Sequence, residues 1–266
     1  MIVDAHVHVF PRAALDGRTP DALVPAEREA PVEQLVELMN AHGVDRAVLV
    51  PLDEHDEYVA SVLDGRFAAI AVGLEELERR RETFAFDGVR TQRLDDRAAL
   101  QWVCDQGLVL WTYLRPDQLP ALLELPAAFP ELRIVLNHLG FFPHDMRVDA
   151  HGRPAFDDPL PREHVEAVLS LARFETVHVM LSGQYALSGQ GPPYRDLDPV
   201  VGALADAYGA DRMLWASDHP WIDDVPGYGA MLALPSQALP GASPAELEAI
   251  RGGTALRLFP RLSGGT

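Results

Sequence analysis

The chain has 266 residues, enough for one large hydrophobic core, and its 48% hydrophobic and 23% charged residues are typical of a globular enzyme. Its formal net charge of -18 argues against nucleic acid or an anionic membrane surface as a partner. All 22 basic residues are arginines, which excludes chemistry on a lysine side chain, such as a Schiff base or a metal site bridged by a modified lysine.

Eight short apolar, β-branched runs are predicted to be strands. In chain order they are residues 2–9, 46–52, 67–73, 86–92, 108–114, 133–140, 176–182 and 213–218. Helix-like stretches lie between most of them, at 32–43, 97–107, 118–129, 163–174 and 197–209, and closing helices are expected at 242–259. A strand that alternates with a helix implies parallel strands covered by helices.

The number of these units predicts the fold class. Eight strand–helix units over residues 1–266 predict a single α/β domain with a closed (β/α)8 barrel. The structural rival is an open doubly wound sheet, which usually carries a glycine-rich loop after its first strand. Here the first strand runs into HVFPRAAL instead, which favours the barrel.

The start of the chain gives no sign of export. Only three residues precede Asp4, and we find neither a charged leader nor an apolar run of about 18 residues. The single cysteine, Cys104, lies in a predicted helix and has no partner for an intrachain disulfide. The cytoplasm is therefore the expected location.

Histidines and an aspartate stand at the ends of three predicted strands. His6 and His8 are two residues apart, so both side chains point to the same side of the first strand. His138 lies at the end of the sixth strand and Asp218 at the end of the eighth. Catalytic groups of such barrels lie at this carboxyl-terminal end. Three imidazoles and a carboxylate would suit one divalent metal ion with a position left for water. The alternative is that each polar residue merely begins a solvated loop.

Several segments carry a resemblance to a known family. DAHVHVF, RIVLNHLG, VHVMLSG and LWASDHP, in this order, together with GGTALRLF near the end, resemble the amidohydrolase superfamily. They are most similar to its TIM-barrel branch of pyrone-dicarboxylate lactonases, sugar-acid lactonases and aminocarboxymuconate-semialdehyde decarboxylases. The resemblance spans nearly the whole chain and implies a centre made of His6, His8, His138 and Asp218. It implies a divalent metal there, zinc first and manganese second, or a metal-free centre with the same residues.

The chain departs from the family pattern at two places. Met180 stands where the family often has a lysine, which removes one contact for an anion. His219 follows Asp218 directly, and tryptophan comes later, at Trp221. His178, one pleat before Met180, is interpreted as a hydrogen-bonded core histidine.

An acidic protein that binds an anionic small molecule needs a local cation. Arg90 lies in the fourth predicted strand, in a GVR segment similar to one that supplies a substrate-binding arginine in the family. A guanidinium can bind a carboxylate through two parallel hydrogen bonds. Arg115, after the fifth strand, is the second candidate. Tyr113 is predicted to line a pocket for a planar substrate, and His219 to be either a substrate contact or a loop residue.

These expectations predict a hydrolase that opens a lactone or a related carbonyl compound bearing a carboxylate or hydroxyls. His6, His8 and His138 would polarise the carbonyl, directly or through a metal, and Asp218 would take a proton from water and pass it to the leaving oxygen. One alternative is non-oxidative decarboxylation of an aromatic or dienoic acid at the same centre. The other is a barrel that binds a ligand or a metal without turnover.

Two long segments follow the sixth and seventh predicted strands, at 141–163 and 182–196. Loops that follow barrel strands commonly carry specificity. Their length suggests a lid over the site or a contact with a partner; the alternative is a plain solvated excursion. A homo-oligomer is a separate expectation.

Overall fold

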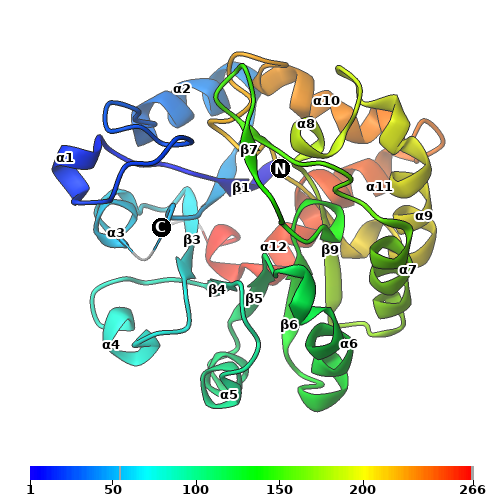
Figure 1. Ribbon diagram of the computed structural model, residues 1–266, viewed down its shortest axis with the longest axis horizontal. Helices are drawn as coiled ribbons and strands as arrows, with labels where there is room; N and C mark the ends of the chain where they lie inside the picture. Colours follow the sequence, from blue (N-terminus) through cyan, green and yellow to red (C-terminus); the bar gives the residue numbers. More distant parts are fainter. Residues whose placement is uncertain (54, 265–266) are drawn as a thin grey trace.

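Eight parallel strands form a nearly closed barrel surrounded by helices in the computed structural model, which describes residues 1–53 and 55–264 (Figure 1). The strands are β1 (Val3–Val7), β2 (Arg46–Leu49), β3 (Phe67–Val72), β4 (Gly88–Thr91), β5 (Val109–Thr112), β6 (Arg133–Leu136), β9 (Val177–Leu181) and β10 (Met213–Trp215). Their order around the barrel is their order in the sequence. The eight predicted strands and the (β/α)8 barrel are thus confirmed.

Helices follow the strands and cover the outside of the barrel (Figure 1). Their bounds are α1 (Ala13–Asp16), α2 (Val32–His42), α3 (Glu57–Val62), α4 (Leu77–Arg81), α5 (Arg97–Asp105), α6 (Leu119–Ala128), α7 (Arg162–Ser170), α8 (Gln184–Leu187), α9 (Asp198–Tyr208), α10 (Tyr228–Ala238), α11 (Pro244–Glu248) and α12 (Thr254–Leu258). The predicted helices are among them, and the tail forms α11 and α12 around a π-helical turn at 249–253.

Local chemistry explains where α2 begins and ends. Pro31 precedes the helix with an extended backbone, and Gly43 ends it in the left-handed conformation that glycine adopts without steric cost. Leu35 and Met39, four residues apart, are both fully buried. This spacing turns one apolar face of the helix toward the strands.

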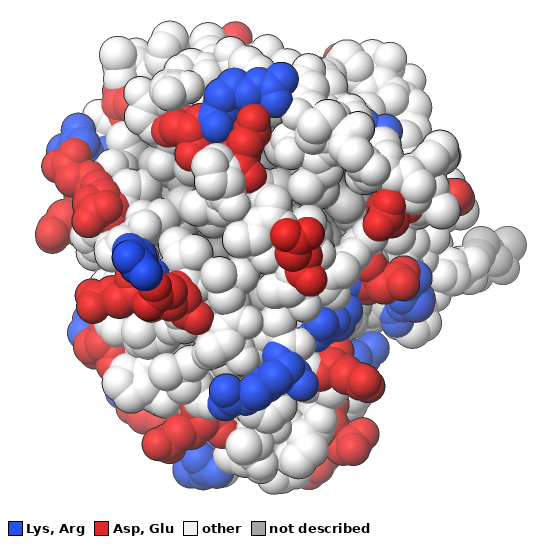
Figure 2. Space-filling model, turned by 90° about the vertical axis from the view of Figure 1, so that its right-hand side faces the viewer, with Lys and Arg blue, Asp and Glu red and all other residues white. Residues whose placement is uncertain are grey.

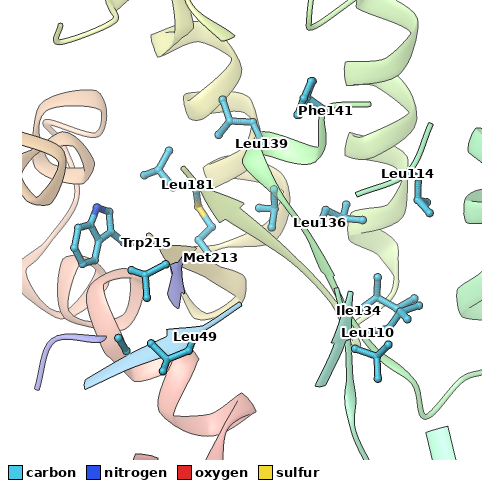
Figure 3. Packing of buried hydrophobic residues seen from close by; sticks show 14 of the residues in the cluster. Leu49, Leu110, Leu114, Ile134, Leu136, Leu139, Phe141, Leu181, Met213 and Trp215 are labelled. Atoms are coloured by element: carbon cyan, nitrogen blue, oxygen red, sulfur yellow. The ribbon is translucent and has the colours of Figure 1, made fainter. Parts of the chain in front are cut away.

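Apolar side chains form two layers, one inside the barrel and one between the strands and the helices. Figure 3 shows part of the outer layer, with side chains such as Leu49, Leu181 and Trp215 from separate strands. Inside the barrel, Trp111 of β5 packs against Phe259, which follows α12, with ring centroids 5.5 Å apart. The segment around α12 therefore closes the end of the barrel opposite to the strand ends that carry the histidines.

The structure differs from the sequence-based expectations around the strand ends. β6 ends at Leu136, and residues 138–140 form a 3-10 turn with left-handed backbone at His138 and Leu139. The sequence NHLG was predicted to belong to the strand, because the turn that it forms is buried in the same way as a strand. α10 was not predicted, because its apolar residues lie on all sides of the helix and not on one face, and because Pro235 lies inside it. The long segment after β6 carries a hairpin of β7 (Arg147–Val148) and β8 (Pro154–Ala155).

Charged side chains on the surface lie close to charges of opposite sign. On the face shown in Figure 2, most arginines lie beside aspartates or glutamates. Along the chain, ion pairs between residues one helical turn apart include Arg162 with Glu166 at 2.6 Å and Arg195 with Asp198 at 3.1 Å. Within the described residues, no helix has the length and the apolar character needed to cross a lipid bilayer.

Candidate active site

His6, in β1, and His8, directly after it, converge at the carboxyl-terminal mouth of the barrel. The pairing of β1 with β2 shifts register between Asp4 and Val7, and the ring of His6 lies near Trp111 in the barrel interior. The Nε2 atoms of His6 and His8 are 3.1 Å apart. Nδ1 of His8 lies 2.8 Å from the carbonyl oxygen of Val50, which can only accept a hydrogen bond. Neutral His8 therefore carries its proton on Nδ1 and presents a lone pair at Nε2.

Asp218 faces these histidines from the segment after β10. Its backbone is left-handed, with φ of 65°, and its N–H donates to the carbonyl of His6 at 3.1 Å. Oδ1 lies 3.7 Å from Nε2 of His6 and 3.9 Å from Nε2 of His8. Oδ2 accepts a hydrogen bond of 2.7 Å from the hydroxyl of Tyr185. Oδ1 is buried without a hydrogen-bond partner among the described residues, so one carboxylate oxygen is held and the other is available.

His138 completes the group from the turn after β6. Its Nδ1 is hydrogen-bonded to Oγ of Ser182 at 2.8 Å, which leaves Nε2 for the site. Gly183 lies against the ring with a left-handed φ of 71°, and a Cβ at this position would be 2.8 Å from Nδ1 of His138. The absence of a side chain at Gly183 therefore leaves room for the ring of His138, which any larger residue would displace.

The cluster fits a divalent metal ion. A bond length of about 2.1 Å allows two ligand atoms of one ion to be at most about 4.2 Å apart. The separations of 3.1, 3.7 and 3.9 Å among His6, His8 and Asp218 lie within that limit. Ligand atoms of His6, His138 and Asp218 lie within 4.8 Å of one another, which is only slightly wider. The buried Oδ1 of Asp218 without a partner is the kind of atom that a cation would satisfy.

Burial sets the protonation of these groups. Desolvation lowers the pKa of His8 and of His138 to about 3 and that of His6 well below its usual value, with nearby positive charges adding to the effect. All three imidazoles are neutral at pH 7, the form that binds a metal ion. Burial raises the pKa of Asp218 to about 7, against the hydrogen bond from Tyr185 and the charge of Arg90, which lower it.

A buried carboxylate joins the two edge strands behind the site. β1 and β10 stand at the two ends of the strand order. Oδ1 of Asp4 accepts from the N–H of Ser217 at 2.8 Å, and Oδ2 accepts from the hydroxyl of Tyr228 at 2.7 Å. The N–H of His8 donates to the carbonyl of His219 at 2.8 Å. These bonds hold the segment that carries Asp218 along β1, and burial raises the pKa of Asp4 to about 6.

A cavity of about 200 Å³ opens in front of this cluster. Its polar lining includes His8, Arg90, Tyr113, His138, Tyr185 and Asp218, and its apolar lining includes Leu23, Leu52, Phe141, Met146, Phe156 and Trp221. Arg90 is in β4, as the sequence indicated, and its guanidinium lies 5.6 Å from the ring centre of Tyr113. Phe156 and Met146 come from the long segment after β6, which thus forms part of the cavity wall.

Two residues predicted from the sequence lie outside this cavity lining. Arg115 is largely exposed and pairs with Asp117 at 3.1 Å; it borders a neighbouring surface pocket. His219 is fully buried, and its Nδ1 lies 2.9 Å from Oδ1 of Asp223. His178 is half-buried, with Nδ1 3.2 Å from the carbonyl of Thr176, and does not line the cavity.

Tyr185 is the site residue that the sequence analysis missed. It belongs to the short helix α8, inside a segment that was expected to be only a loop. A tyrosine in such a segment carries no distinctive signal. Its position three residues after Ser182, directly behind a strand end, is the one cue in the sequence.

The fold and the cluster together define a (β/α)8 barrel with histidines and an aspartate at its mouth that could hold a divalent metal ion. Comparisons with known proteins agree. The model of the amidohydrolase family matches residues 3–261. L-fucono-1,5-lactonase from Burkholderia ambifaria is 31% identical over 261 residues, covering 87% of this chain and 85% of the relative. 4-Sulfomuconolactone hydrolase from Rhizobium radiobacter is 26% identical, covering 82% of this chain and 75% of the relative.

A solved structure supports the same fold. An amidohydrolase from Burkholderia multivorans with bound zinc superimposes with a TM-score of 0.77 at 22% identity, covering 98% of this chain and 99% of that one. This chain therefore belongs to the amidohydrolase family, as its motifs had indicated, and it is a hydrolase.

Proposed function

We propose that the protein is a lactonase, which opens a cyclic ester bearing hydroxyls or a carboxylate. The observation that carries this proposal is the pair of carboxylate oxygens on Asp218. One is held by Tyr185, and the other is directed at the imidazoles of His6 and His8 beside the cavity. The names of the two related lactone hydrolases support the substrate class.

In the proposed reaction, the carboxylate of Asp218 accepts a proton from the attacking water and later returns it to the leaving ring oxygen. Its pKa of about 7 suits a group that must both take and release a proton near neutrality. Arg90, half-buried in the cavity wall, binds a carboxylate or a hydroxyl oxygen of the substrate. The aromatic side chains of Tyr113 and Trp221 pack against the faces of the ring.

His6, His8, His138 and Asp218 would hold a divalent metal, with zinc proposed first. The ion would polarise the ester carbonyl and lower the pKa of a water molecule to about 7. His8 is fixed for this role by the carbonyl of Val50, and His138 by Ser182. The support for this ligand set is the short separation between the ligand atoms of His6, His138 and Asp218.

Replacement of Asp218 by asparagine tests the proposal. We expect the kcat for lactone opening to fall by about 100- to 10,000-fold, because the amide cannot accept the proton. Asp117→Asn, which alters an exposed carboxylate paired with Arg115, is the matched control. Circular dichroism checks that both variants fold, and mass spectrometry of the product checks that one water is added and no carbon dioxide is lost. A near-normal rate in Asp218→Asn would refute the assignment.

Three further expectations stay predictions from the sequence. They are the identity of the metal, a homo-oligomer, and a cytoplasmic location. Elemental analysis of protein purified without a metal-affinity tag addresses the first. Light scattering in solution addresses the second.

A further inference from the structure

Arg90 is a half-buried cation that makes no ion pair in the described part of the chain. Its Nη2 donates to the carbonyl of Leu52 at 3.0 Å, and its guanidinium lies over the ring of Tyr113. Burial lowers its pKa, but a guanidinium stays charged. A desolvated charge without a counterion is costly, so the position favours a bound anion.

The other arginines near the mouth are already engaged. Arg28 donates to the carbonyls of Leu23 at 2.9 Å and Gly152 at 2.6 Å, and it lies 4.7 Å from the ring centre of Trp221. Each of three others pairs with a nearby carboxylate: Arg153 with Asp149, Arg93 with Asp95 and Arg115 with Asp117. Among the described residues, Arg90 is therefore the one cation lining the cavity that is free to meet a substrate anion.

A larger groove of about 650 Å³ adjoins the cavity and has the opposite charge. Cavity and groove share Leu52, Arg90 and Gln92. The groove is lined by four carboxylates, those of Asp53, Glu75, Asp95 and Asp96, which outnumber its basic side chains. Of the latter, His55 is already bonded to Asp53 and Arg93 to Asp95, which leaves Glu75 and Asp96. A second negative charge on a substrate bound at Arg90 would therefore meet either apolar side chains or a surface of like charge, and both are unfavourable.

We propose that this site selects lactones with at most one anionic group, and that Gln92 determines this limit. The inference rests on the proposed lactonase function and goes beyond it by naming a class of substrate that the site excludes, namely lactones with two or more anionic groups. Gln92 borders the cavity, the acidic groove and the surface pocket beside Arg115. An amide there binds hydroxyls but adds no positive charge for a second carboxylate.

Three probes test the charge limit on the wild-type protein. They are a neutral sugar 1,5-lactone, a lactone with one carboxylate and a lactone with two carboxylates. We expect the kcat/KM of the dicarboxylate to be at least about 100-fold lower than that of the better of the other two, because the second charge is left unpaired. Equal kcat/KM values for one and two carboxylates would overturn the inference and leave the lactonase proposal standing. If the folded protein opens none of the three, the lactonase proposal fails, and the inference fails with it.

Variants identify the residues responsible. Gln92→Arg should raise the ratio of kcat/KM between the dicarboxylate and the neutral lactone by about tenfold, since an added cation at the rim of the cavity would pair with the second carboxylate. Arg90→Gln should lower the kcat/KM of the monocarboxylate about 100-fold and that of the neutral lactone much less; Arg90→Lys, which keeps the charge, should restore part of the loss. Arg93→Gln, on the groove side, is the matched control. A Gln92→Arg variant with an unchanged ratio would refute the role of Gln92.

Discussion

Tyr185→Phe removes one hydroxyl from the centre of the site. The tyrosine donates a hydrogen bond of 2.7 Å to Oδ2 of Asp218, and both side chains are buried. Phenylalanine keeps the ring in the cavity wall, so the packing is preserved. The variant therefore isolates what one hydrogen bond does to the carboxylate that is proposed as the base.

The size of the effect follows from this geometry. A hydrogen bond to a charged group contributes about 1.5–3 kcal/mol, which corresponds to about one to two pKa units at ~1.4 kcal/mol per unit. The bond from Tyr185 lowers the pKa of Asp218, which burial raises to about 7. Its loss should raise that pKa further, so the acidic limb of the kcat/KM profile should move to higher pH by about one to two units. At pH 7 the variant should be about tenfold slower, and it should recover as the pH rises.

The assay is the rate of lactone opening, followed by acid release between pH 5 and 9 and corrected for spontaneous hydrolysis. Tyr208→Phe is the control, because its hydroxyl donates to the carbonyl of Val168 at 2.6 Å, away from the cavity. An acidic limb that does not move in Tyr185→Phe, together with an unchanged kcat, would contradict the reasoning. Such a result would mean that Oδ2 is not coupled to catalysis.

The remaining predictions concern stability. Asp4→Ala leaves a buried N–H and the hydroxyl of Tyr228 without an acceptor, so the free energy of unfolding should fall by about 2–6 kcal/mol at ~1–3 kcal/mol for each group. Phe259→Ala opens a cavity beneath Trp111 and should cost about 3–5 kcal/mol. In metal-free protein, the three buried histidines of the site have lowered pKa values, so the stability that they contribute is lost as the pH falls below 6.5. The two buried carboxylates have raised pKa values and act in the opposite sense, so these five groups together give a net loss of ~1.4 kcal/mol per pH unit between about pH 6 and 4. His178, whose pKa burial lowers to about 4, adds to this loss.

Urea titrations measure all three effects, and each has its own contrast. Asp4→Asn keeps an acceptor for the N–H of Ser217 and should be the milder change at that position. Phe259→Leu fills most of the space and should cost less than the alanine variant. Stability that rises between pH 6 and 4 would show that the carboxylates outweigh the imidazoles.

The sequence predicts the framework of this protein well. Alternating apolar runs and helical stretches specify the barrel, because buried parallel strands must be apolar on both faces. The candidate ligands were found for the same reason. His6, His8, His138 and Asp218 are polar residues at the ends of apolar strands, and parallel strands bring such ends to one edge.

What the sequence misses depends on the exact path of the backbone. The left-handed conformations of His138 and Asp218 are decided by packing and by neighbours such as Gly183, and no local pattern reports them. Tyr185 contacts Asp218 across 33 positions of sequence, from a segment with no regular period. The exposure of Arg115 was equally hidden, since one residue beyond a strand end can turn inward or outward.

The junction of β1 and β10 has a consequence for how the enzyme loses activity on heating. Isolated hydrogen bonds from Asp4, His6 and His8 join these strands, in place of a regular ladder, and the proposed base lies on the segment they hold. Thermal opening of the barrel should therefore begin where the reacting groups are assembled. Catalytic rate should decline several degrees below the melting temperature reported by circular dichroism, and amide hydrogens of residues 216–219 should exchange earlier than those of β3 or β5.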